Sequence, residues 1–133
     1  MLKANGKFID TLPLRNLFSL GEHYSDTITI EVDSSYENLD LSGFTFVMRA
    51  VTPSGEEVKT ILPKIAPDDD RYLWLIWNVS RAFTSEAGTL FLDLFAYQYH
   101  DPAADPSETP PDYLIRYQLP PIEIRDIPKI SET

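Results

Sequence analysis

The sequence predicts a single all-β domain, a β-sandwich of about seven or eight short strands. Short segments of alternating or continuous apolar character recur along the 133 residues. Clusters of Pro, Gly, Asp and Ser separate these segments, which is typical of turns between strands. No segment shows the 3.6-residue apolar period of a long helix. A small closed barrel is the main alternative to the sandwich.

The first half of the chain contains three predicted strands. Residues 27–32 alternate strictly between apolar and polar side chains, as a half-buried strand does. Residues 43–51 place Phe44, Phe46, Met48 and Ala50 on one face of a second strand. Residues 53–56 (Pro-Ser-Gly-Glu) form a tight turn, and residues 57–62 return as the other half of a hairpin. The polar segment 34–42 is predicted to be a loop.

The second half of the chain contains the most apolar strands, at residues 72–79 and 90–99. We expect one row from each strand to face the other across the core; the rows are Leu73, Leu75, Trp77 and Val79, and Leu90, Leu92, Leu94 and Ala96. Two closing strands follow at residues 113–119 and 122–124. Pro120 and Pro121 separate them, because proline donates no hydrogen bond to a sheet.

The chain divides into three predicted regions. Residues 1–20 carry scattered apolar groups and a proline, which indicates an extended N-terminal arm with one short strand. Residues 21–127 make up the sandwich, and residues 128–133 form a flexible C-terminal tail. Residues 100–111 hold four of the eleven prolines and are predicted to be an irregular loop.

The composition argues against several classes of function. A net charge of −10 and the even spread of eleven Lys and Arg residues disfavour nucleic-acid binding. No apolar run reaches the length of a membrane span, and the N-terminus lacks the apolar core of a signal peptide. The absence of cysteine excludes disulfides and thiolate chemistry. We therefore expect neither a nucleic-acid partner nor a membrane partner.

No catalytic or cofactor-binding motif is present. Nucleophile elbow, phosphate loop, dinucleotide fingerprint and zinc-binding helix are all missing. His23 and His100 have no carboxylate at a ligand-like spacing. The acidic sets, Asp68, Asp69 and Asp70, and Asp101, Asp105 and Glu108, lack the spacing and glycine of a calcium loop. We predict a protein that is not an enzyme, with no metal and no cofactor; a hydrolase with an unrecognised carboxylate pair is a further alternative.

The second faces of the two most apolar strands are unusually aromatic. A sandwich with one core needs largely polar outer faces, yet these faces carry Tyr72, Trp74, Ile76, Phe91, Phe95, Tyr97 and Tyr99. Three explanations are open: the N-terminal arm, with Phe8 to Phe18, covers the face; a neighbouring subunit covers it; or the aromatic rings stack on sugars. The predicted interface residues are Tyr72, Trp74, Ile76, Phe91, Phe95, Tyr97, Phe8 and Phe18.

The order of several short segments resembles the immunoglobulin-like β-sandwich modules of tailed phages, particularly the N-terminal domain of phage baseplate upper proteins. The segments are residues 26–32, 38–43, 53–55, 73–79, 87–90 and 113–124. The resemblance implies an immunoglobulin-like sandwich that assembles into a multi-subunit ring or collar, and it brings no catalytic residues. Baseplate upper proteins usually continue beyond this module, whereas this chain stops at Thr133, which favours a small component of the tail, neck or capsid.

The function expected from these observations is that of a bacteriophage structural protein. It would be made in the host cytoplasm, reside in the virion, and bind copies of itself and other virion proteins. The alternative is a carbohydrate-binding β-sandwich module in which Trp74, Tyr97 and Tyr99 stack on a glycan.

Overall fold

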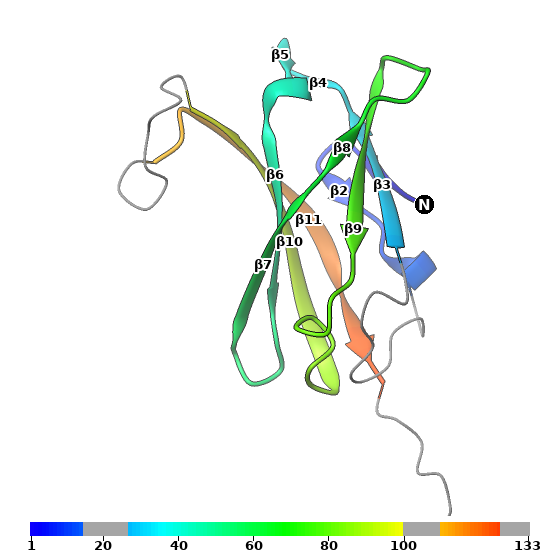
Figure 1. Ribbon diagram of the computed structural model, residues 1–133, viewed down its shortest axis with the longest axis vertical. Helices are drawn as coiled ribbons and strands as arrows, with labels where there is room; N and C mark the ends of the chain where they lie inside the picture. The colour runs from blue at the N-terminus through cyan, green and yellow to red at the C-terminus, as the bar shows by residue number, and fades with distance from the viewer. Residues whose placement is uncertain (15–26, 100–109, 126–133) are drawn as a thin grey trace, which may run out of the picture.

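The computed structural model describes residues 1–14, 27–99 and 110–125, and in these residues the chain is all-β as predicted. Nine strands form one mixed sheet in the order β7-β6-β10-β11-β2-β1-β3-β9-β8 (Figure 1). Their bounds are β1 Leu2–Asn5, β2 Phe8–Ile9, β3 Thr27–Asp33, β6 Thr45–Val51, β7 Glu57–Leu62, β8 Lys64–Ile65, β9 Tyr72–Asn78, β10 Gly88–Gln98 and β11 Tyr113–Ile124.

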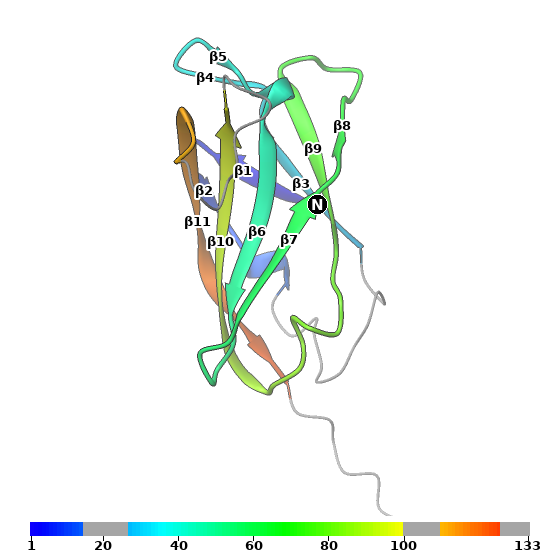
Figure 2. The ribbon, with the colours of Figure 1, turned by 60° about the vertical axis from the view of Figure 1, so that its left-hand side comes forward.

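The sheet folds over into the two layers of a sandwich (Figure 2). We call β7, β6, β10, β11 and β2 the front sheet, and β3, β9 and β8 the back sheet. Strand β1 joins the two sheets, because it pairs antiparallel with β2 and parallel with β3. On the opposite side the chain passes from β7 to β8 through Pro63, whose carbonyl accepts a hydrogen bond of 2.9 Å from the Ile76 amide of β9. The sandwich is therefore closed in part on both sides, like a barrel.

The core lies between the sheets, and both predicted rows line it. Leu75, Trp77, Leu94 and Ala96 are fully buried, and the remaining members of the two rows are at least nine-tenths buried. Strands β9 and β10 belong to different sheets, so their inner rows approach the core from opposite sides. Each strand shows the period of two that places alternate side chains on opposite faces.

The N-terminal residues contribute to the sandwich itself. Leu2 of β1 and Ile9 of β2 are buried, and the Gln118 amide of β11 donates a hydrogen bond of 2.7 Å to the Lys7 carbonyl. The arm thus supplies two short strands where the sequence indicated one. The predicted boundaries at residues 20/21 and 127/128, the loop at 100–109 and the C-terminal tail lie outside the described residues.

Two predictions of local structure were wrong. The predicted loop at 34–42 contains the hairpin β4 (Ser35–Tyr36) and β5 (Leu39–Asp40), followed by a short 3-10 helix, η2 (Leu41–Gly43). Its turn places Glu37 and Asn38 at positive φ, a combination the sequence pattern did not reveal. The two closing strands are one strand, β11, because the ladder with β10 continues past Pro120 and Pro121 through a register shift opposite Phe91.

Candidate protein-interaction surface

The structure divides the predicted interface residues between two opposite faces of the sandwich. Phe91, Phe95 and Tyr97 lie on β10 and Phe8 lies on β2, so these four share the outer face of the front sheet. Tyr72, Trp74 and Ile76 lie on β9 and belong to the outer face of the back sheet. Because β9 and β10 are not neighbours in one layer, these aromatic side chains do not form one shared surface. Phe18 lies outside the described residues.

The outer face of the back sheet is an ordinary solvated sheet surface. Each aromatic or aliphatic side chain of β9 faces a polar partner on β3: Trp74 is opposite Glu31, Ile76 opposite Thr29, and Tyr72 opposite Asp33. The Trp74 indole donates a hydrogen bond of 3.0 Å to the Glu31 carboxylate. Trp74 is half-buried and its polar atom is satisfied. Its other neighbour, Ile65 of β8, is 49% exposed, so among the described residues this face carries one exposed large apolar side chain where the front sheet carries four.

The outer face of the front sheet is apolar across several neighbouring strands. Phe91 lies opposite Val51, Phe95 opposite Val47, and Tyr97 opposite Leu114. Four large apolar side chains of this sheet are about half exposed or more: Phe8 at 48%, Phe91 at 56%, Leu114 at 58% and Ile61 at 65%. Contiguous apolar surface of this kind marks interaction sites far more often than scattered single residues do. We call this surface the front face.

A row of paired charges crosses the front face in the middle. Asp93 accepts contacts from Arg116 at 2.7 Å and from Arg49 at 3.2 Å, and Arg49 also contacts Glu57 at 2.7 Å. At the end of the row, the Lys59 ammonium group contacts the Glu57 carboxylate at 3.0 Å. Contacts with Lys59 and then Arg49 hold the pKa of the Glu57 carboxyl below its usual range. Each carboxylate thus has two cationic neighbours, and a partner surface can cover the row without leaving an anion unpaired.

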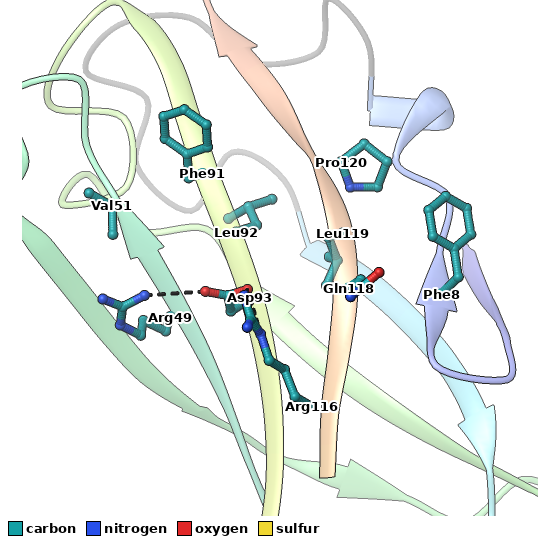
Figure 3. Close-up of a pocket in the computed structure, with 10 residues that line it drawn as sticks. All are labelled: Phe8, Arg49, Val51, Phe91, Leu92, Asp93, Arg116, Gln118, Leu119 and Pro120. Carbon is teal, nitrogen blue, oxygen red and sulfur yellow. Dashed lines mark hydrogen bonds and ion pairs between the residues drawn. The ribbon is translucent and has the colours of Figure 1, made fainter.

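Two shallow hollows lie on either side of the charged row. The larger, about 540 Å³, is lined by Phe8, Val51, Phe91 and Pro120 together with the charged residues (Figure 3). Figure 3 shows Phe91 and Phe8 on opposite sides of β11, with Arg49, Asp93 and Arg116 below them. The second, about 390 Å³, is lined by Val47, Phe95, Tyr97, Tyr99, Pro111 and Leu114, with Arg49 and Lys59 at its edge. Both hollows are open and apolar, as expected of a surface that receives protruding side chains.

The described part of the N-terminal arm does not cover the front face. Strand β2 lies beside β11 in the sheet and β1 lies beyond β2, and Phe8 adds to the apolar surface beside β11.

The proposed sugar platform does not form as one surface either. Trp74 lies on the back sheet, and the rings of Tyr97 and Tyr99 meet edge to face at 79°.

Sequence reasoning missed the residues that complete the front face. Ile61 and Leu114 are exposed apolar residues on β7 and β11, and Arg49, Asp93 and Arg116 meet in one set of ion pairs. Their common signal is strand pairing: Arg49 lies opposite Asp93, and Arg116 lies two residues along β11 from Gln118, the other partner of Asp93. A sequence without known strand order does not supply these neighbours.

The described residues hold no group of His, Cys, Asp and Glu arranged to bind a metal ion. Asp69 is instead paired with Arg71 at 2.6 Å, which lowers the pKa of its carboxyl to about 2. None of the helices in the described parts of the chain has the length and apolar character needed to cross a membrane.

The comparisons with known proteins assign no family to this fold and surface. No protein-family model matches the chain, and a search of the curated proteins finds no match either.

Proposed function

We propose that this chain is a structural protein of a bacteriophage particle, a component of the tail, baseplate, neck or capsid, that acts by assembling with copies of itself and with other virion proteins. The observation that carries the assembly role is the front face, where exposed aromatic and aliphatic residues of four strands adjoin. The phage setting rests on the resemblance of residues 26–124 to the sandwich modules of tailed phages.

The charge distribution favours the front face as the contact between copies. The chain carries a net charge of −10, so two copies repel each other over most surfaces. The charged row has three cations, Arg49, Lys59 and Arg116, and two anions, Glu57 and Asp93. Its surplus of one positive charge is opposite in sign to the net charge of an approaching copy.

The chemistry of the front face suits a protein partner. Aromatic side chains and arginines are enriched at the centres of protein interfaces, where they carry most of the binding energy. Phe91 and Phe95 flank the Arg49–Asp93–Arg116 contacts in this way. A glycan would require polar groups beside flat, accessible rings, and Tyr97 and Tyr99 present no such pair.

The test is molar mass in solution by light scattering over a range of concentrations, for the parent chain and for a variant carrying Phe91→Ser and Leu114→Ser. We expect the parent to self-associate as its concentration rises, and the variant to stay folded and associate more weakly because the front-face contact is lost. A parent chain that stays monomeric at every concentration would overturn assembly with itself. Equal association of parent and variant would overturn the front face as the contact.

A further inference from the structure

We infer that strand β7 is a self-pairing edge, through which two copies of this chain join their front sheets into one continuous antiparallel sheet. This inference goes beyond the front face, because it concerns the backbone of an edge strand and a defined register. The occupant of the edge is a second copy of the same strand.

The pairing of β7 leaves one of its two backbone edges open. It pairs with β6 from Glu57 opposite Val51 to Leu62 opposite Phe46, and no strand among residues 1–14, 27–99 and 110–125 pairs with its other side over 57–61. After Pro63 the chain continues as β8, which pairs with β9 of the back sheet. In Figure 2, β7 lies at the border of the front layer. An unpaired strand edge is a template for another strand.

The register of β7 on β6 shows which backbone groups are free. The Thr52 amide donates to the Glu56 carbonyl at 2.9 Å, and successive pairs run Val51 with Glu57 and Ala50 with Val58. Because hydrogen-bonded and non-hydrogen-bonded pairs alternate in an antiparallel ladder, the amide and carbonyl of Val58 point toward β6. Those of Glu57, Lys59 and Ile61 therefore point toward the open edge.

The side chains of β7 select one register for a second copy. A two-fold axis at Val58 places Glu57 of each copy opposite Lys59 of the other, so two cross-strand pairs of opposite charge form. Shifting the axis to Glu57 or to Lys59 sets like charges opposite each other, and shifting it to Thr60 removes both charge pairs. Charged residues on an edge ordinarily discourage pairing with other strands. Here they favour a copy of the same strand in a single register.

The shape of the hairpin leaves room for this contact. Glu57, Lys59 and Ile61 are exposed on the outer side, and Val58 and Thr60 are only half-buried on the inner side. Joining two β7 strands would set the two front faces side by side in one sheet. The contact at β7 uses backbone groups at the edge of the sheet and the front face uses outward side chains, so both are available to one assembly, with Glu57 and Lys59 taking part in each.

The register can be trapped with a single cysteine, because the chain has none of its own. In the inferred dimer the two copies of residue 58 form a non-hydrogen-bonded pair with Cα atoms about 4.5 Å apart, within the range of a disulfide. Val58→Cys should give a disulfide-linked dimer under mild oxidation. Thr60→Cys is the matched control, since it has similar burial but its two copies would lie roughly 13 Å apart along the strands. We expect at least a tenfold difference in the rate of cross-linking.

A second variant tests the edge without a cross-link. Lys59→Pro removes an amide that points away from β6, so the fold keeps its ladder and the dimer loses a hydrogen bond at its centre. We expect a folded chain whose edge dimer, followed by sedimentation, weakens at least tenfold. Equal cross-linking at positions 58 and 60, or no cross-linking at either, would overturn the inference. The Phe91→Ser and Leu114→Ser variant should still cross-link at residue 58, which separates failure of the edge from failure of the front face.

Discussion

The two outer faces of this sandwich are built on equally apolar strands, yet only one of them is a candidate for binding. On the back sheet, β9 carries Tyr72, Trp74 and Ile76, but β3 places Asp33, Glu31 and Thr29 opposite them. On the front sheet, β10 carries Phe91, Phe95 and Tyr97 among Val51, Val47 and Leu114. The character of a sheet surface is therefore decided by the strands on either side of an aromatic strand, more than by that strand alone.

The largest expected effect on stability comes from substitutions in the core that the two sheets share. Leu75→Ala on the back sheet and Leu92→Ala on the front sheet each remove a buried side chain. Each should lower the free energy of unfolding by about 2–5 kcal/mol, measured by urea denaturation. If either variant unfolds at the parent midpoint, its row does not line the common core.

The next effect is a loss of stability at high pH, and it depends on contact between the two sheets. Burial, reinforced by the negative charge of Asp33 on the back sheet, raises the pKa of Tyr117 on the front sheet to about 12. The unfolded chain has a tyrosine pKa of about 10, so between these values the unfolded state releases the proton and the folded state keeps it. Stability should therefore fall as pH rises above about 10, by about 3 kcal/mol in total from this group.

The variant that isolates this contribution is Tyr117→Phe. Unfolding midpoints in urea, measured from pH 9 to pH 12, should fall less steeply in Tyr117→Phe than in the parent. Identical slopes for the two proteins would show that Tyr117 titrates normally and is not enclosed between the sheets.

A smaller effect comes from the charged row of the front face. Asp93 is the most buried member of the row, with a side chain 19% exposed, and it contacts both Arg49 and Arg116. Asp93→Asn should cost about 1 kcal/mol of stability, because two guanidinium groups lose their shared anion. Thermal unfolding at low and high salt measures it, and the cost should shrink as salt rises. A cost that is independent of salt would point to lost packing instead.

The smallest effects on stability distinguish the two outer faces directly. Trp74→Phe removes the indole hydrogen bond to Glu31 and should cost about 1 kcal/mol. Phe91→Ser removes a side chain that is 56% exposed and should change stability by no more than about 0.5 kcal/mol. Chemical denaturation of both variants checks this order. The reverse order would mean that Phe91 packs against the chain's own residues.

Much of the fold could be predicted from the sequence because alternation reports burial along a single strand. Residues 27–32 and 72–79 matched β3 and β9 to within one residue at the C-terminal end, and both predicted core rows are buried. The hairpin β4–β5 was missed because its turn relies on Glu37 at positive φ, which that residue type rarely adopts. Strand β11 was split in the prediction because a bulge accommodates Pro120 and Pro121 within the ladder.

The candidate surface could be predicted only in part, since it depends on which strands are neighbours. Phe91, Phe95 and Tyr97 were recognised from their positions on an apolar strand and Phe8 from the N-terminal arm, and the structure places the four on one face. Trp74 satisfied the same criterion and lies on the opposite face. Arg49 and Asp93 are 44 residues apart in sequence and meet only through the pairing of β6 with β10.

Matched substitutions on the two outer faces test most directly which face carries self-association. One variant carries Phe91→Ser and Phe95→Ser on β10, and the other carries Tyr72→Ser and Ile76→Ser on β9, and the molar mass of each is measured by light scattering beside the parent. We predict that only the β10 variant associates more weakly than the parent. Loss in the β9 variant with retention in the β10 variant would contradict the assignment of binding to the front sheet.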